Sequence, residues 1–190
     1  VDTNSTDGTV EIARERGVRV VDEPRRGYGR AYKTGFKNAR GEYIATLDAD
    51  CTYPPDRIPE FLKILDSDEA DFIIGDRLSN LYPGAMSLLH RVGNGILNIT
   101  ARLLFHIRLK DSQSGMWVFR RELLSSLKIV SDDMPFSEEI KIEAITKGFR
   151  VEQIPIEYGS RIGEKKLHSW GDGWRNFKFL FLKKFGGMSS

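Results

Sequence analysis

The chain has 190 residues, of which 40% are hydrophobic and 29% charged, and its formal net charge is +2 at pH 7. This composition fits one globular domain with a substantial core, and so small a net charge gives no support for a nucleic-acid partner. The single cysteine, Cys51, excludes a disulfide within the chain and fits a reducing compartment.

Apolar runs and helix-capping patterns alternate along the first part of the chain. Runs bounded by Gly, Pro or charged residues predict strands over 18–21, 43–47 and 71–75. Capping residues, terminal glycines and helical spacing predict helices over 5–16, over 31–39 and from Pro55 onward. This alternation predicts an α/β fold with a mainly parallel sheet. The first eight residues have the pattern of a strand end and a turn, so we expect one strand, one helix and most of a second strand upstream of them.

The second half of the chain has a different pattern. Helical spacing predicts a long helix over 86–105 and a shorter one over 138–146, and apolar runs predict strands over 116–119 and 151–156. Pro155 cannot donate a backbone hydrogen bond, which places the last strand at a sheet edge or ends it there. No apolar run reaches the ~20 residues that a membrane-spanning helix needs.

The two carboxylates of Asp48 and Asp50 follow the apolar run over 43–47. Acidic side chains one residue apart, where a strand opens into a loop, can share one hard divalent cation and leave room for the phosphates of a ligand. Ligands of open α/β sheets collect at the carboxyl ends of strands. The alternative for Asp-x-Asp is an ordinary solvated turn.

Further motifs occur in order around this pair: Val1-Asp2-Thr3-Asn4-Ser5-Thr6-Asp7-Gly8-Thr9, Gly27-Tyr28-Gly29-Arg30-Ala31 and Ala39-Arg40-Gly41-Glu42-Tyr43. Together with the paired aspartates they resemble the family-two glycosyltransferases, which have the GT-A fold. Three later segments resemble acceptor-side motifs of the branch that makes dolichyl-phosphate mannose or glucose: Asp111-Ser112-Gln113-Ser114-Gly115, Phe119-Arg120-Arg121-Glu122 and Arg161-Ile162-Gly163-Glu164-Lys165-Lys166-Leu167. Gly84-Ala85-Met86 and Gly93-Asn94 are most similar to its archaeal members.

This resemblance implies one glycosyltransferase domain over 1–190, with a nucleotide-sugar half over 1–80, an acceptor half over 81–173 and an amphipathic tail over 174–190. It also implies a Rossmann-like, mainly parallel sheet that is flanked by helices and lacks its first strand in this chain. The reaction expected for such a protein is metal-dependent, inverting hexosyl transfer from a GDP- or UDP-sugar to a polyprenyl phosphate.

On the donor side, the resemblance implies that Asp48 and Asp50 hold Mg²⁺ or Mn²⁺ against the diphosphate, with Asp50 the main catalytic group. Asp2 is implied to hold the base or ribose. Arg30 lies at the front of a predicted helix, where free amides favour a phosphate, although a solvated arginine is an equal alternative.

The chain departs from the family pattern at three places. The usual first strand, with its Pro-x-x-Asn-Glu segment, is absent. Thr52 stands where the family often has a metal-side Gln, and Lys165 stands in the serine position of an Arg-x-Gly-x-Ser-Lys motif.

On the acceptor side, the candidates for binding the phosphate are Arg77, Arg161 and Lys166, because arginine pairs bidentately with phosphate and lysine supplies a point charge. Ser114, with the glycine after it, would let the backbone approach the sugar, or it forms a structural turn.

A polyprenyl phosphate is already anionic and needs no general base, whereas a sugar hydroxyl acceptor needs one. Glu139 is the candidate base by resemblance. A solvated helix face containing Glu138, Lys141 and Glu143 is its slightly preferred alternative.

Apolar and basic residues share the segment 86–105 and the tail from Trp174. Apolar residues at helical spacing in the first segment are Leu89, Val92, Ile96, Ile99 and Leu103. Core packing accounts for at least half of each segment in one interpretation. In the other, both lie on a bilayer and bring in a lipid acceptor, which places the protein peripherally on the cytoplasmic face of a membrane.

Two other functions stay open at the level of sequence. One is transfer to a saccharide hydroxyl, which the motif at Arg161–Leu167 disfavours. The other is a non-catalytic fragment that binds a nucleotide or a lipid, which the missing first strand motivates. GDP or UDP, and mannose or glucose, stay open as well.

Overall fold

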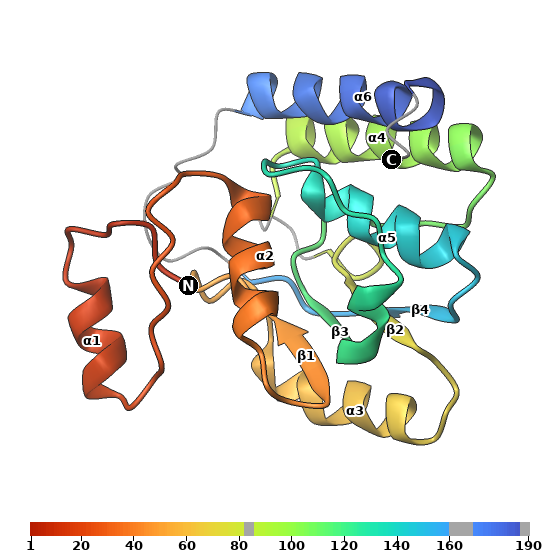
Figure 1. Ribbon diagram of the computed structural model, residues 1–190. Helices are drawn as coiled ribbons and strands as arrows, with labels where there is room; N and C mark the ends of the chain where they lie inside the picture. Colours follow the sequence, from red (N-terminus) through yellow and green to blue (C-terminus); the bar gives the residue numbers. More distant parts are fainter. Residues whose placement is uncertain (82–85, 160–168, 187–190) are drawn as a thin grey trace.

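A computed structural model describes residues 1–81, 86–159 and 169–186 of the chain (Figure 1). Its centre is a four-stranded sheet in the order β1-β3-β2-β4. The strands are β1 (Tyr43–Thr46), β2 (Phe72–Asp76), β3 (Trp117–Arg120) and β4 (Val151–Pro155).

The sheet is mixed. β2 and β4 pair in parallel, whereas β3 lies between β1 and β2 and is antiparallel to both. β1, β2 and β4 therefore run in one direction, as the strand–helix alternation predicts, and the α/β class is confirmed. β3 comes after the alternation ends, which is why the pattern gave no sign of its reversed insertion. Pro155 closes β4 at the sheet edge, as predicted.

Six α-helices surround the sheet within the described residues. They are α1 (Thr9–Glu15), α2 (Tyr28–Asn38), α3 (Ile58–Asp66), α4 (Leu88–Phe105), α5 (Phe136–Thr146) and α6 (Ser169–Phe185). Two 3₁₀ turns, Pro55–Arg57 and Arg121–Ser125, precede α3 and follow β3. None of these helices is both long and apolar enough to cross a bilayer, over the ranges that the structure describes.

Side chains alternate between the two faces of the sheet and build two apolar clusters. Phe72 and Trp117 face the cluster that α2, α4 and α5 cover, while Ile73 and Val118 face α3 on the other side. The rings of Phe72 and Phe119 stack with centroids 4.9 Å apart across β2 and β3. The domain is therefore a three-layer sandwich, with α4 and α6 lying side by side along one side of it (Figure 1).

The strand predicted over 18–21 is wrong. Asp2 and Asp22 form a single isolated parallel bridge there, with Asp2 N–H donating to Val21 O at 2.9 Å. A single bridge leaves this segment as an extended edge and not as a strand.

The solvated-face interpretation of the helix around Glu139 is also wrong. Residues Phe136 to Ala144 of α5 are all buried, including Glu138, Lys141 and Glu143. A pattern of charges along a helix normally indicates a solvent face, but here α5 lies between the sheet and α6, and its charged groups find partners in the loops around it.

Two buried basic side chains hold the loop over 111–115 in place. The Arg77 guanidinium, which follows β2, donates to both carboxylate oxygens of Asp111 at 2.8 Å each. Lys141 Nζ on α5 donates to the carbonyl oxygens of Ser112 and Ser114, at 2.6 Å each. Burial alone would raise the pKa of Asp111, but the Arg77 guanidinium holds it below its ordinary value. The loop is thus fixed to the end of β2 and to α5.

Asp111→Asn should lower the free energy of unfolding by about 3–5 kcal/mol, because it leaves the buried Arg77 charge without its partner. Since the pKa of Asp111 is lowered in the folded protein, the stabilisation is present above the ordinary value of 3.8 and is lost as the pH falls below it. Urea unfolding at pH 7 measures the change.

The matched control is Glu60→Gln, which removes an exposed pair with Arg57 and should cost no more than about 1 kcal/mol. Equal effects of the two substitutions would contradict a special role for the buried pair.

Candidate functional site

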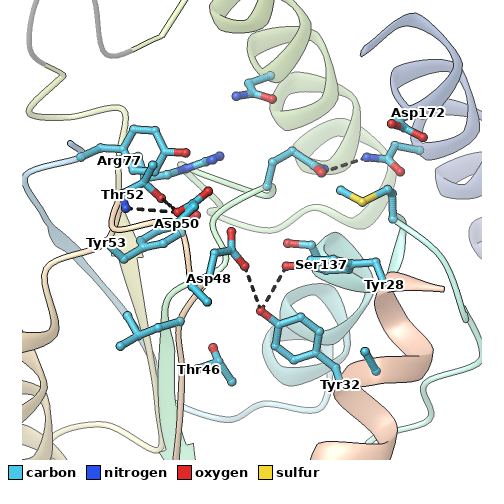
Figure 2. A pocket seen from close by; sticks show the side chains of 18 of the residues that line it. Tyr28, Tyr32, Thr46, Asp48, Asp50, Thr52, Tyr53, Arg77, Ser137 and Asp172 are labelled. Carbon is cyan, nitrogen blue, oxygen red and sulfur yellow. Dashed lines mark hydrogen bonds between the residues drawn. The ribbon is translucent and has the colours of Figure 1, made fainter. Parts of the chain in front are cut away.

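An open cavity of about 1480 Å³ lies at the carboxyl end of β1. Asp48 and Asp50 line it, together with residues of α2, α4 and α6 (Figure 2). Strand ends at this edge and helices from the second half of the chain therefore form one site.

Asp48 is held from two sides. Tyr32 of α2 donates its hydroxyl to Asp48 Oδ1 at 3.5 Å, as Figure 2 shows. Burial, and secondly the Asp48 charge, raise the pKa of Tyr32, so that its hydroxyl stays a proton donor at neutral pH. On the other side, a Cβ built on Gly115 would lie 3.1 Å from Asp48 Oδ2 and 3.2 Å from Oδ1. Only a glycine leaves this carboxylate its present position.

Asp50 is oriented by its own loop. Its Oδ1 accepts the backbone N–H of Thr52 at 3.1 Å and the Thr52 hydroxyl at 2.6 Å. Cys51 between them has a φ of 61°, in the left-handed region that non-glycine residues rarely adopt. The threonine in place of the family's glutamine is thus a positioning group for Asp50.

The two aspartates fit a hard divalent cation that is shared with a ligand. Their oxygens are the donors that Mg²⁺ and Mn²⁺ prefer. Among the residues that the structure describes, no group of three or more His, Cys, Asp or Glu side chains could hold a metal. Within the described residues, Asp48 and Asp50 thus offer part of a coordination shell, to which the phosphates of a ligand and water can add.

The other predicted donor residues lie outside the cavity lining. Asp2 accepts Ser5 N–H at 3.0 Å, beside the cavity-lining Val1. Arg30 pairs with Asp132, whose carbonyl also accepts the Arg30 backbone N–H at 2.9 Å. The structure does not bring Asp2 and Arg30 together with the paired aspartates, and their donor roles stay predictions.

The predicted acceptor residues are divided as well. Arg77 lines the cavity, although its charge is paired with Asp111. Ser114 is fully buried and donates its hydroxyl to Gly75 O at 2.6 Å, which is the structural-turn role. Arg161 and Lys166 lie outside the described residues.

Glu139 is buried away from the cavity. It accepts the backbone N–H groups of Val130 and Ser131 and pairs with Lys183 at 3.1 Å. Structural contacts occupy this carboxylate, so the geometry does not support a role for Glu139 as a general base. That role stays a prediction.

Several residues of the cavity were missed from the sequence. Tyr28 and Tyr32 lie one turn apart on α2, a spacing that is readable but typical of core residues. Gln113 lies inside the motif over 111–115, in which a role was predicted only for Ser114 and the glycine after it. Ser137 and Asn176 also line the cavity, and nothing in the sequence pattern marks either of them.

Residues 1–128 match the family model described as glycosyl transferase family 2. Two curated proteins of Haloferax volcanii are similar to the chain over most of its length. The low-salt glycan biosynthesis hexosyltransferase Agl6 is 39% identical over 189 residues, covering 98% of this chain and 46% of that protein. The dolichyl-phosphate hexose transferase is 34% identical over 171 residues, covering 89% and 73%. The chain thus spans less than half the length of the first of these relatives.

Among solved structures, the glucosyl-3-phosphoglycerate synthase of Mycobacterium tuberculosis has a similar fold. Its complex with Mn²⁺, UDP and glucosyl-3-phosphoglycerate matches with a TM-score of 0.72 at 21% identity, covering 98% of this chain and 67% of that one. Its complex with Mg²⁺ and UDP matches with a TM-score of 0.74 at 20% identity, covering 96% and 66%. At this identity the match shows a GT-A-like fold alone.

Gly115→Ala should weaken divalent-cation binding about tenfold, since the new methyl group displaces the Asp48 carboxylate while the flexible side chain spares the fold. Calorimetric titration of Mn²⁺ in the presence of UDP measures the affinity.

Gly95→Ala is the matched control, because nothing lies within 4 Å of a Cβ added to this helical glycine. It should leave cation affinity unchanged. Unaltered binding in Gly115→Ala would mean that Asp48 needs no such space.

Proposed function

Since the chain belongs to glycosyl transferase family 2 and is a glycosyltransferase, we propose that it transfers a hexose from a nucleoside-diphosphate sugar to a polyprenyl phosphate, with inversion at the anomeric carbon. The single observation that carries this proposal is the cavity, in which two carboxylates and the apolar side chains of α4 and α6 share one space. A cation held by the carboxylates would bind the diphosphate of a nucleotide sugar, and the apolar side chains would bind the hydrocarbon of a lipid phosphate. The name of the Haloferax dolichyl-phosphate hexose transferase supports the same acceptor class.

At the donor end, Asp48 and Asp50 would hold Mg²⁺ or Mn²⁺, the ions named in complexes of the fold neighbour. A cation there neutralises the charge that develops on the departing diphosphate. Tyr32 and Thr52 fix the two carboxylates beforehand, so little reorganisation is needed when the donor binds.

At the acceptor end, Leu89 and Ile96 of α4 and Trp174 and Phe177 of α6 give the cavity an apolar wall. A polyprenyl chain would lie against this wall with its phosphate toward Arg77. The phosphate oxygen attacks as an anion, so positioning contributes more than proton transfer. This acceptor also suits a cavity that Glu139 does not line.

The outer faces of α4 and α6 support a peripheral position on a membrane. Leu88, Val92, Ile99 and Leu103 form one stripe on α4 next to the cavity-lining Ile96, with Leu88 75% and Leu103 70% exposed. The interpretation of this stripe as protein core is therefore wrong. The helix instead buries its opposite side, which holds Leu97, Asn98 and Ala101.

On α6, Trp174, Phe181 and Phe185 form a second exposed stripe beside Lys178 and Lys184. Phe179 and Leu180 on its other side are buried, as core packing predicts for part of the tail. α4 and α6 pack together, so both stripes can reach one bilayer (Figure 1). We propose the cytoplasmic leaflet, since Cys51 is a free exposed thiol that suits a reducing compartment.

The defining experiment is a screen of GDP- and UDP-hexoses with a short-chain polyprenyl phosphate and Mn²⁺ or Mg²⁺. Asp50→Ala should abolish transfer and Asp48→Ala should reduce it by more than a hundredfold, because an uncompensated diphosphate is a poor leaving group. Glu60→Gln on the surface is the control. Full activity in excess chelator would contradict the role given to the cation.

Trp174→Ser with Phe185→Ser should weaken binding to anionic liposomes by at least tenfold, since each buried aromatic side chain contributes about 1.5–3 kcal/mol. Binding should also fall with salt, because each lysine near the surface contributes about 1 kcal/mol. Co-sedimentation measures both effects.

Ile12→Ser provides the matched control, because Ile12 is an exposed apolar residue on α1, away from α4 and α6. If it weakens binding as much as the double substitution, the stripes are not the membrane-binding surface.

A further inference from the structure

A network of hydrogen-bonded polar side chains joins α6 to α5 through the loop over 111–115. Asn176 Nδ2 donates to Gln113 Oε1 at 2.8 Å, and Gln113 Nε2 donates to Glu138 Oε2 at 2.9 Å. Gln113 also donates to the Ser112 hydroxyl at 3.3 Å. Burial raises the pKa of the Glu138 carboxyl group above its ordinary value.

The donor and acceptor roles of these side chains determine which polar atom is left without a partner. The amide N–H groups of Gln113 donate to Glu138 and Ser112, so its oxygen accepts the hydrogen bond from Asn176. Asn176 therefore donates its NH₂ group to Gln113, and its Oδ1 atom has no hydrogen-bond partner among the residues that the structure describes. Asn176 is only 3% exposed, and a buried amide oxygen without a donor is energetically unfavourable.

This unpaired oxygen belongs to the wall of the cavity that holds the paired aspartates, since Asn176 and Gln113 both line it. Asp172, one helical turn before Asn176, lies across the cavity from Asp48 and Asp50 in Figure 2. Gln113 is two residues before Gly115, which packs against the Asp48 carboxylate. A group that bridges the space between Asp48 and α6 would meet the Asn176 oxygen.

The chemistry of this wall selects a hydroxyl group. An acceptor oxygen repels the oxygens of a phosphate but accepts the proton of an alcohol. The neighbouring charge agrees, because the acidic Asp172 in the same cavity wall does not attract an anion. Phe177 and Leu97 beside them offer apolar surface.

We propose that Asn176, oriented by Gln113, binds one hydroxyl group of the hexose that is transferred and so selects among hexoses. The proposal rests on the proposed function, because it takes the donor sugar to lie between the aspartates and α6. A site that hydrogen-bonds a substrate hydroxyl discriminates strongly against the analogue that lacks it, since its own polar group is then left unpaired.

The test compares the intact nucleotide hexose with its 2-, 3-, 4- and 6-deoxy analogues, in wild type and in Asn176→Ala. In wild type, kcat/KM and calorimetric affinity should fall about ten- to a hundredfold for one analogue. In Asn176→Ala the intact donor should fall by that factor and the same analogue should lose nothing further. Affinity for the nucleoside diphosphate alone should stay within about twofold, which also shows that the variant is folded.

Asn94→Ala is the matched control, an asparagine that lines the same cavity on α4 and donates to Met86 Sδ. It should keep the wild-type ratio between analogue and intact donor. Gln113→Met is the second variant, for the case that Asn176→Ala does not fold, and it should also lower the ratio because Asn176 loses its orienting partner.

An unchanged ratio in Asn176→Ala for every analogue overturns the proposal, and so does a wild type that accepts all analogues equally. Failure of the proposed function gives a different result: no hexose reaches a polyprenyl phosphate. In that case the calorimetric comparison of nucleoside diphosphate, nucleotide hexose and deoxy analogues still decides whether Asn176 binds a sugar hydroxyl.

Discussion

The buried pair of Arg77 and Asp111 is the interaction on which the site depends. It joins the end of β2 to the loop over 111–115, and Lys141 fastens the next turn of that loop to α5. Removing the charges of Arg77 and Asp111 from water is costly, so hydrophobic side chains of similar volume would give a more stable core. They would not fix the loop's backbone by directed hydrogen bonds to its carboxylate and carbonyl groups. The charges therefore serve the loop's position more than the fold's stability.

The position of that loop controls both halves of the cavity. Gly115 at its end leaves room for the Asp48 carboxylate, and Gln113 two residues earlier accepts a hydrogen bond from Asn176 of α6. A shift of the loop would move the cation-binding carboxylate and the α6 wall together. The substitutions at Asp111, Gly115 and Asn176 thus act on one structural unit, and their effects should not be additive.

Local features of the sequence predicted the α/β class, most helices and strands, and the paired aspartates. Asp48 and Asp50 were recognisable because two residues separated by only one other stay close together in any fold. The reversed insertion of β3 was not, because pairing with β1 and β2 depends on contacts far apart in the chain. Charge patterns also misled at α5, whose Glu139 and Lys141 are buried among partners that only tertiary structure supplies.

α6 links the outer surface of the protein to its cavity. Its exposed stripe is held in place from behind, by Asn176 on Gln113 and by Lys183 on Glu139 and Glu143. A helix that only covered the core would bury its aromatic residues, yet Trp174 is 67% and Phe185 73% exposed while Asn176 is buried. Phe179 and Leu180 are buried on the inner side, so the exposed aromatic residues mark one face of the helix. That exposed face has a physical reason if the outer side meets lipid and the inner side meets a sugar. One helix would then set the distance between the bilayer surface and the reacting atoms, which an acceptor with a lipid tail and a phosphate head requires.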